Sequence, residues 1–307
     1  MSKLIRQTFA IDDSYPLILK VEDVLEEITG SLRLRGIADP HRVATDIVAA
    51  LLDVPRSWPA INRETGVSDE IATRADEAVT KLSAGAPFAY AVGCTQFRHL
   101  DLLVDERVLI PRPETEILVS EVLDLMSARF GTSDDWGIAI DIGTGSGAIA
   151  LSLAAEGRFE RVIATDASAD ALEVAQLNAT RLASELRAPV EFRRGSLLSP
   201  VAGVKAAVLV SNPPYIAFSE IETLPRSVRD WEPPMALFSG HDGMSATTEI
   251  VRDGSGSLVS GGILALEVDE RRASLVAEVI MRHGSYTDVG VRLDLTGRER
   301  FVLATRV

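Results

Sequence analysis

Short apolar segments and helical stretches alternate along the chain from Gly137 onward. Four apolar segments of strand length stand at 138–140, 162–164, 206–210 and 263–268. Helical patterns separate them, notably at 169–186, and this alternation predicts a parallel sheet covered by helices on both faces. Segments 289–295 and 301–305 flank a turn at 296–297 and predict a final hairpin. The predicted fold class is therefore α/β, Rossmann-like, with a mostly parallel sheet and an antiparallel last strand.

The residues before this region predict helices only. One helix is expected over 16–28, ending near Gly30. Asp39 precedes a proline and Ser68 precedes two acids, and both are typical helix starts. These patterns predict a small N-terminal helical bundle.

Between the bundle and the alternating region the pattern changes. Phe97, Leu100 and Leu102 stand among turn residues between 87 and 110 and suggest short strands, arranged as a hairpin. A helix is then expected from Glu114 to Phe130. We therefore expect three parts: a helical domain at 1–86, a linker with a β-hairpin at 87–112, and a main domain at 113–307.

Composition excludes several classes of protein. The 307 residues include 31 Lys and Arg against 45 Asp and Glu, which gives a net charge of −14. Stable nucleic-acid binding is disfavoured, because affinity for a phosphate backbone comes mostly from basic side chains. The single cysteine, Cys94, allows no intrachain disulfide. Residues 1–13 lack the apolar stretch of a signal peptide, and no apolar run approaches the ~20 residues of a membrane helix. We expect a cytoplasmic monomer that does not bind membranes.

The first chemical motif is a glycine-rich turn between a predicted strand and a predicted helix. Its residues are Asp141, Ile142, Gly143, Thr144, Gly145, Ser146 and Gly147. An acid, Asp166, ends the next strand and is placed to accept the ribose hydroxyls of an adenosine cofactor. The spacing of Gly143, Gly145 and Ala148 also satisfies a loose dinucleotide pattern, so the glycines alone leave the nucleotide open. Asp141 favours S-adenosylmethionine, whose ammonium and sulfonium are cationic, over a pyrophosphate.

The second motif follows the strand at 206–210. It consists of Asn212, Pro213, Pro214 and Tyr215. In an open α/β fold this position lies at the carboxyl edge of the sheet, where ligands bind. The side-chain oxygen of Asn212 and the carbonyl of Pro213 can accept the two N–H bonds of an –NH2 group, while Tyr215 stacks on a planar substrate. Such a clamp aims a delocalised nitrogen lone pair at a methyl carbon and stabilises the developing charge, and it requires no metal.

The two motifs together resemble class I methyltransferases that modify exocyclic nitrogens. Residues 109–116, Leu-Ile-Pro-Arg-Pro-Glu-Thr-Glu, look like the signature of the HemK (PrmC) family of peptide chain release factor N5-glutamine methyltransferases. Further similarity lies at 85–90, at 231–237, at 242–243 and at 295–298. The resemblance extends over essentially the whole chain.

The resemblance implies S-adenosylmethionine as cofactor, S-adenosylhomocysteine as product and release factors as protein partners. It implies that Asn212 and Pro213 hold the glutamine amide of a Gly-Gly-Gln motif, and that Asp166 holds the cofactor ribose. The cofactor would also contact Asn212, the glycine turn and the segment that carries Arg112, Glu114 and Thr115. The family often has an acid and an aromatic beside the adenine. Here Ser196 and Leu197 occupy those positions, so apolar contacts are expected there.

Three alternatives remain open at the level of the sequence. A methyltransferase acting on a glutamine of a ribosomal protein would share the same chemistry. A DNA adenine methyltransferase uses a similar tetrapeptide but usually has a basic cleft, which the charge of −14 disfavours. A protein that binds the cofactor without catalysis would need a disrupted Asn212 or glycine turn, and both are intact.

Overall fold

The computed structural model describes residues 19–131 and 135–307. The chain divides into two units, Met1–Cys94 and Thr95–Val307, and this division falls inside the expected linker at 87–112. The segment 1–13 and the expected helix start at residue 16 lie outside the described residues. No helix of the described part is long and apolar enough to span a membrane.

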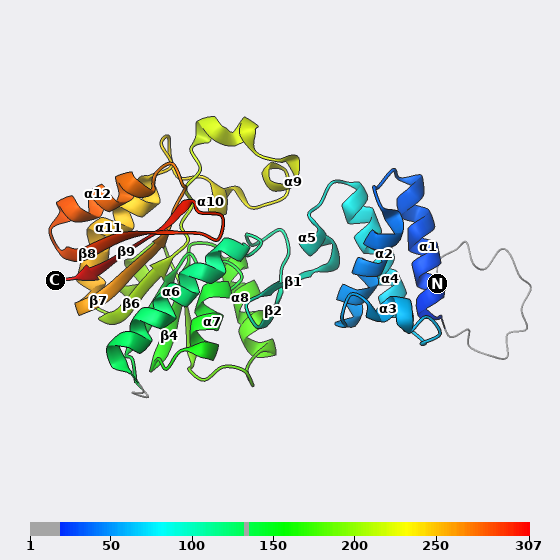
Figure 1. Cartoon of the computed structure of the whole chain (residues 1–307), viewed down its shortest axis with the longest axis horizontal. Coiled ribbons are helices and arrows are strands. Elements are labelled where there is room, and N and C mark those ends of the chain that lie inside the picture. Colours follow the sequence, from blue (N-terminus) through cyan, green and yellow to red (C-terminus); the bar gives the residue numbers. More distant parts are fainter. Residues whose placement is uncertain (1–18, 132–134) are drawn as a thin grey trace, which may run out of the picture. The chain divides into compact units, whose positions relative to one another are not determined.

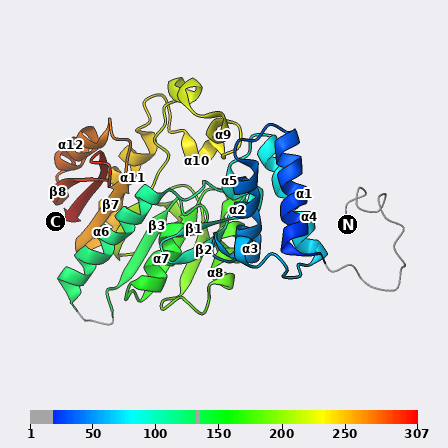
Figure 2. The same cartoon turned by 45° about the vertical axis from the view of Figure 1, so that its right-hand side comes forward.

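The N-terminal unit is a bundle of helices around its own apolar core. Residues of three amphipathic helices, among them Ile28, Ile47 and Val79, are buried there. Figure 2 shows these helices in blue to cyan. The helices of this unit are α1 (Val21–Leu34), α2 (Pro40–Leu52), α3 (Trp58–Ile61), α4 (Asp69–Ser83) and α5 (Phe88–Val92).

The helix boundaries of this unit differ in part from the sequence prediction. The expected stop at Gly30 is wrong, because α1 continues to Leu34. Leu32 is fully buried, and its burial outweighs the ~1 kcal/mol that a glycine costs inside a helix. Ser68 caps α4 as predicted and accepts a hydrogen bond from the backbone N–H of Ile71. Asp39 does precede α2, but it adopts a left-handed backbone with φ of +49° and its side chain makes no capping bond.

The first part of the expected linker at 87–112 holds a helix where strands alone were expected. Residues Phe88–Val92 form α5, and Tyr90 and Val92 are buried. Gly93 ends this helix with φ of +82°, a left-handed conformation that suits glycine. The predicted hairpin then follows, as a separate two-stranded sheet of β1 (Cys94–Phe97) and β2 (Leu100–Leu103).

The second unit contains a sheet of seven strands in the order β5-β4-β3-β6-β7-β9-β8. All pairings are parallel except those of β9, which runs antiparallel to both β7 and β8, as predicted for the last strand. The strands are β3 (Ile138–Ile142), β4 (Arg161–Asp166), β5 (Val190–Arg194), β6 (Ala206–Ser211), β7 (Leu258–Glu267), β8 (Tyr286–Leu293) and β9 (Glu299–Arg306). The sequence prediction missed β5, which reads Val-Glu-Phe-Arg-Arg. As an edge strand, it exposes charged side chains and so lacks an apolar run.

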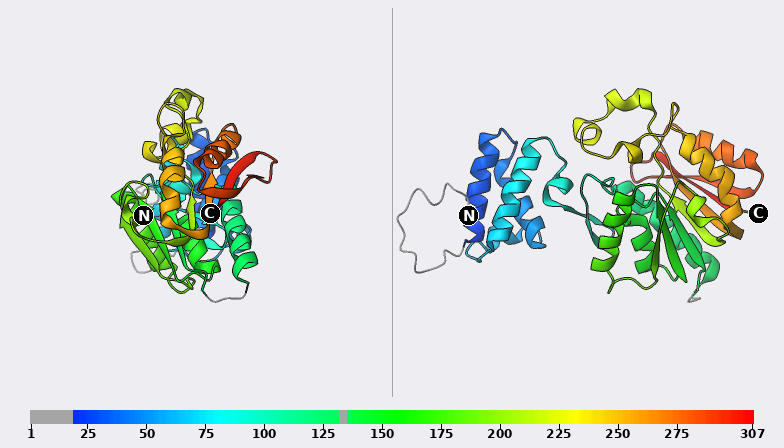
Figure 3. Two further views of the ribbon diagram at one scale, coloured as in Figure 1. Left: turned by 90° about the vertical axis from the view of Figure 1, so that its left-hand side faces the viewer. Right: turned by 180° about the vertical axis from the view of Figure 1, so that it is seen from behind.

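Helices cover both faces of this sheet, as Figures 1 and 3 show. On one face, α6 (Pro113–Phe130), α7 (Ala148–Glu156) and α8 (Ala169–Arg181) pack beside the hairpin. On the other face, α11 (Ser245–Ser257) and α12 (Ala273–His283) form a second apolar core. The helix expected over 169–186 therefore ends earlier, at Arg181. Short helices occupy the segment from β6 to α11, drawn in yellow in Figure 1: η3 (Phe218–Thr223), α9 (Arg226–Arg229) and α10 (Pro234–Leu237).

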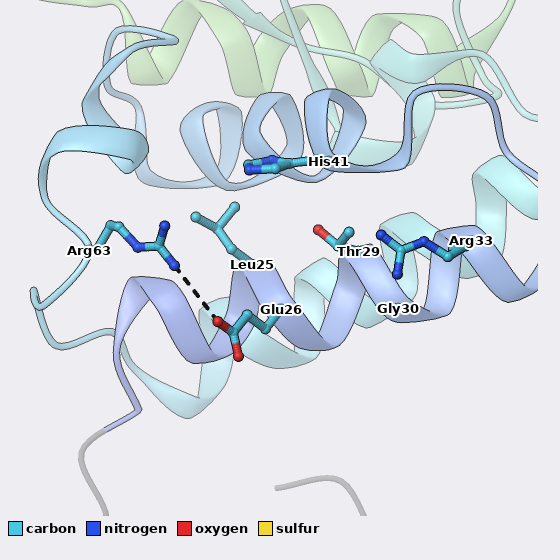
Figure 4. A pocket seen from close by; sticks show the side chains of 7 residues that line it. All are labelled: Leu25, Glu26, Thr29, Gly30, Arg33, His41 and Arg63. Atoms are coloured by element: carbon cyan, nitrogen blue, oxygen red, sulfur yellow. Dashed lines mark ion pairs between the residues drawn. The ribbon is translucent and has the colours of Figure 1, made fainter.

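A hollow of about 290 Å³ lies within the N-terminal unit. Figure 4 shows side chains of α1 facing His41 of α2 across this hollow, with Arg63 paired to Glu26 at 3.7 Å. None of the residues predicted to bind cofactor or substrate lines it. All of those predicted site residues belong to the second unit.

Candidate active site

The register of the sheet aligns the carboxyl ends of four neighbouring strands. Ile142 of β3 pairs with Thr165 of β4 on one side and with Ser211 of β6 on the other. Ser211 in turn pairs with Leu266 of β7. The residues that follow these paired positions form one row along the sheet edge: Gly143, Asp166, Asn212 and Glu267. Parallel pairing therefore brings together both sequence motifs and one acid that was not predicted.

Asp141 lies at the end of β3 and is fully buried. Its Oδ2 accepts hydrogen bonds from Thr144 Oγ1 at 2.7 Å and from the backbone N–H of Ala150 at 3.1 Å. Among the described residues, no hydrogen-bond donor reaches its Oδ1. Burial raises the pKa of Asp141 to about 7, although these two hydrogen bonds oppose the rise. A buried carboxylate with a free oxygen is suited to a cationic ligand group.

The glycine turn is shaped by positive backbone angles. Gly143 and Gly145 have φ of +72° and +54°, a region in which residues with a Cβ are strained. The N–H groups of Gly143 and Thr144 both donate to the carbonyl of Thr165 at 2.9 Å. A Cβ built on either glycine would meet no heavy atom of the chain within 4 Å. The turn therefore offers a bare stretch of backbone that a ligand can approach closely.

Asp166 lies beside the glycine turn at the end of β4. Its Oδ2 accepts from the backbone N–H of Gly145 and its Oδ1 from that of Ser168, both at 2.9 Å. The side chain is only partly exposed, and burial raises its pKa. Each carboxylate oxygen has a further lone pair, so Asp166 can still accept hydrogen bonds from two hydroxyl groups.

Asn212 directly follows β6 and contacts a threonine of α6. Its Nδ2 donates to Thr115 Oγ1 at 3.2 Å, and Thr115 Oγ1 donates to Glu267 Oε2 at 2.7 Å. Thr115 and Glu267 are 4% and 1% exposed. Burial raises the pKa of Glu267 to about 7. The residue predicted to clamp the substrate is thus backed by a buried hydrogen-bonded chain.

The rest of the tetrapeptide is held by the segment before α11. Pro213 is buried, and burial raises the pKa of Tyr215 to about 12. A Cβ on Gly243 would lie 2.3 Å from the carbonyl oxygen of Tyr215, so only glycine fits there. The next residue, Ile216, donates to the carbonyl of Leu237 at 3.0 Å. These contacts anchor the backbone at Tyr215 and Ile216, at the end of the tetrapeptide.

The predicted segment with Arg112, Glu114 and Thr115 forms the start of α6. The guanidinium of Arg112 donates to both carboxylate oxygens of Glu232, at 2.6 and 2.7 Å, and Glu232 is almost completely buried. Glu114 is partly exposed in the first turn of α6. The ion pair therefore fastens α6 to the segment that follows the tetrapeptide.

Leu197 and Ser196 follow β5, on the far side of Asp166. Leu197 has φ of +46° and packs partly buried against an apolar core, while Ser196 is exposed. The N–H of Gly195 donates to the carbonyl of Asp166 at 2.9 Å, which ties this turn to the end of β4. No cluster of metal-ligating side chains occurs within 19–131 and 135–307.

Two acids of this site were missed by the sequence prediction. Glu267 is the last residue of β7, just as Asp166 is the last residue of β4, and it lies one residue before the end of the apolar segment 263–268. That shared position was the signal that could have identified it. Glu232 lies within the Trp-Glu-Pro-Pro run at 231–234 and has no local feature that predicts its pairing with Arg112.

The site defines the class of protein, and known proteins agree with it. The fold resembles the hMettl16 catalytic domain in complex with MAT2A 3'UTR hairpin 1, with a TM-score of 0.53, 16% identity and coverage of 84% of this chain and 90% of that one. The Methyltransferase small domain family model matches residues 119–224, and the PrmC N-terminal domain model matches residues 23–93. The chain is therefore an enzyme with the class I methyltransferase fold.

Full-length relatives narrow this class to one family. The release factor glutamine methyltransferase of Moorella thermoacetica is 37% identical over 94% of this chain and 99% of its own length. The protein of the same name from Koribacter versatilis is 40% identical over 87% of this chain and 91% of its own. The chain belongs to the release factor glutamine methyltransferase family.

Proposed function

We propose that this enzyme transfers a methyl group from S-adenosylmethionine to the N5 amide nitrogen of the glutamine in the Gly-Gly-Gln motif of peptide chain release factors. The observation that carries the proposal is the clamp at Asn212. Its Nδ2 is bound to Thr115, so its Oδ1 is left to accept a hydrogen bond from a substrate –NH2 group. The names of its relatives, release factor glutamine methyltransferases, support the release factor as the protein substrate.

The residues at the strand edge fit the proposed cofactor. Asp141, with one unpaired buried oxygen, would hold the ammonium group, and the bare backbone of Gly143 and Gly145 would line the methionine part. Asp166 would accept hydrogen bonds from the ribose hydroxyls, and Leu197 would contact the adenine. When bound, S-adenosylmethionine would supply an electrophilic methyl group and leave as S-adenosylhomocysteine, while the methylated amide nitrogen would lose one proton to water.

The tetrapeptide would orient the nucleophile. An amide nitrogen is a poor nucleophile because its lone pair is delocalised into the carbonyl. Asn212 Oδ1 and the carbonyl of Pro213 would accept hydrogen bonds from the two N–H groups of the substrate amide. This would turn the nitrogen lone pair toward the methyl group and stabilise the positive charge that develops on nitrogen. Tyr215 would pack against the flat amide. Its hydroxyl stays protonated, because its pKa is raised to about 12.

The N-terminal unit would serve to dock the protein substrate. All residues proposed for cofactor binding and catalysis belong to the second unit, whereas the match to the PrmC N-terminal domain covers 23–93. A separate helical unit that carries none of the proposed site residues is suited to recognising the protein substrate beyond its reacting side chain.

A labelling experiment tests the proposed reaction. The enzyme is incubated with a bacterial release factor and radiolabelled cofactor, and the label is located by mass spectrometry. We expect one methyl group on the glutamine of Gly-Gly-Gln. Absence of label on the release factor, or label only at another of its residues, would refute the proposal.

Asn212→Ala tests the role of the clamp. The variant is expected to lower kcat by about a hundredfold or more, because one preorganised contact to the reacting group is lost. Calorimetry with S-adenosylhomocysteine is the control for folding, and its Kd is expected to change by less than about threefold. Full turnover by Asn212→Ala would contradict the assignment.

A further inference from the structure

Three side chains from distant parts of the chain form one hydrogen-bonded line behind the substrate clamp. Asn212 lies 97 residues from Thr115 in the sequence, and Thr115 lies 152 residues from Glu267. Thr115 and Glu267 are almost completely buried, and neither belongs to the tetrapeptide. The line begins at β7, passes through the first turn of α6 and ends at the substrate-facing loop after β6.

The chemistry of the line gives it a direction. An ionised carboxylate only accepts hydrogen bonds, so the hydroxyl of Thr115 must donate its single proton to Glu267. The oxygen of Thr115 is then an acceptor toward Asn212. Only the –NH2 end of the Asn212 amide can satisfy an acceptor, and the Oδ1 end is therefore turned away from Thr115.

We propose that Glu267 and Thr115 are positioning residues that orient the side-chain amide of Asn212, so that its Oδ1 faces the glutamine –NH2. This inference rests on the proposed function, since it assigns an orientation to the residue that holds the substrate. A reversed Asn212 amide would point –NH2 at the substrate –NH2, two donors facing each other, and leave the Thr115 oxygen without a donor. The buried line selects the productive orientation before the substrate arrives.

The charge of Glu267 sets the direction of the line. Burial and the carboxylate of Glu114 disfavour its ionised form, whereas Arg300 and Arg112 favour it, and the buried Tyr215 lies close enough to feel its charge. The net result is a pKa of about 7. Above that pH, Asn212 Nδ2 donates to Thr115 and Thr115 donates to the ionised Glu267. Below it the protonated carboxyl can donate to Thr115, the Thr115 hydroxyl can donate to a reversed Asn212, and the preference is lost.

A pair of threonine variants tests the positioning role. Thr115→Val keeps the shape of the side chain but removes the hydroxyl, and we expect kcat at saturating cofactor to fall about tenfold. Thr115→Ser, which keeps the hydroxyl, should recover kcat to within about threefold of the wild type. The Kd for S-adenosylhomocysteine should stay unchanged in both variants, which also reports that they fold.

Two outcomes of the threonine experiment would overturn the inference. One is wild-type kcat in Thr115→Val. The other is a loss in Thr115→Val that appears in cofactor Kd alone and vanishes at saturating cofactor, which would make Thr115 a cofactor contact. If instead the wild-type enzyme labels no glutamine, the proposed function has failed, and this result is distinct from either.

The pH profile tests the role of Glu267. The substrate amide does not titrate near neutral pH, so the wild-type kcat at saturating cofactor should fall as pH drops below about 7. In Glu267→Gln the kcat should be lower and nearly independent of pH over the same range. An unchanged pH profile in Glu267→Gln would sink the proposal.

Discussion

Asp141 is completely buried, and its Oδ1 accepts no hydrogen bond from any residue within 19–131 and 135–307. Its pKa in the folded chain is about 7, whereas its ordinary value is 3.8. The folded state therefore holds a proton more tightly than the unfolded state does. Linkage then requires this group to lower the free energy of unfolding as pH rises from about 4 through about 7. Asp141 thus weakens the protein without its cofactor at the pH where it would bind a cation.

We expect Asp141→Asn to stabilise the protein without cofactor at pH 8 while weakening cofactor binding. The gain in the free energy of unfolding should be on the order of 1–3 kcal/mol, because the variant removes a buried charge but alters the bonds to Thr144 and Ala150. Urea unfolding from pH 5 to 8 measures it. The affinity for S-adenosylhomocysteine should fall at least about tenfold in calorimetry.

The pH dependence separates this effect from a general gain in packing. The difference between Asp141→Asn and the wild type should shrink toward zero as pH falls to 5, where Asp141 itself is neutral in the fold. Other buried acids, such as Glu267, titrate alike in both proteins and cancel. A constant difference at all pH values, or a destabilised variant at pH 8, would contradict the assignment.

At the scale of elements, one buried side chain joins the hairpin to the glycine turn. Asn178 of α8 is fully buried. Its Oδ1 accepts from the N–H of Leu103 in β2 at 2.7 Å, and its Nδ2 donates to the carbonyls of Leu103 and Ser146 at 3.0 and 2.9 Å. Three elements thereby share one amide, and the backbone beside the proposed cofactor site depends on it.

We expect Asn178→Ala to lower the free energy of unfolding by about 2–4 kcal/mol, because backbone groups of Leu103 and Ser146 lose their partners while they stay buried. The matched control is Gln176→Ala, which removes an exposed amide from the same helix and should cost less than about 0.5 kcal/mol. Urea unfolding of both variants makes the comparison. Equal effects would show that Asn178 contributes only helix propensity.

At the scale of the whole molecule, the net charge of −14 is the property that acts over distance. A release factor segment that contacts ribosomal RNA should be basic, so long-range attraction would speed its encounter with this enzyme. We expect kcat/KM for an intact release factor to fall several-fold between about 50 and 300 mM salt. A short neutral peptide that contains the target glutamine is the control and should show little change. Salt-independent kcat/KM for the intact protein would exclude electrostatic steering.

Local patterns were enough to predict most elements of the second unit. The strands β3, β4, β6 and β7 are buried apolar runs, and the two strands of the final hairpin are joined by a recognisable turn. Each of these sequence patterns lies within a few neighbouring residues. The two motifs could likewise be located from the sequence, because Asp141 lies near the end of β3 and Asn212 directly follows β6. Elements whose signal is not local were missed or misplaced. The edge strand β5 contains three charged residues among its five and so has no apolar run. The short helix α5 depends on the burial of Tyr90, which is a tertiary contact.

The sequence by itself determined the class of fold and the family, and it supplied the residues proposed to face cofactor and substrate. Only the tertiary structure determined which buried residues support the proposed site. Parallel register placed Glu267 in the same row as Asn212, and the packing of α6 inserted Thr115 between them. Strand and turn preferences act over a few neighbouring residues. The hydrogen bond between Thr115 and Glu267 spans 152 residues, so it forms only after the sheet and α6 have packed together and excluded water from both side chains.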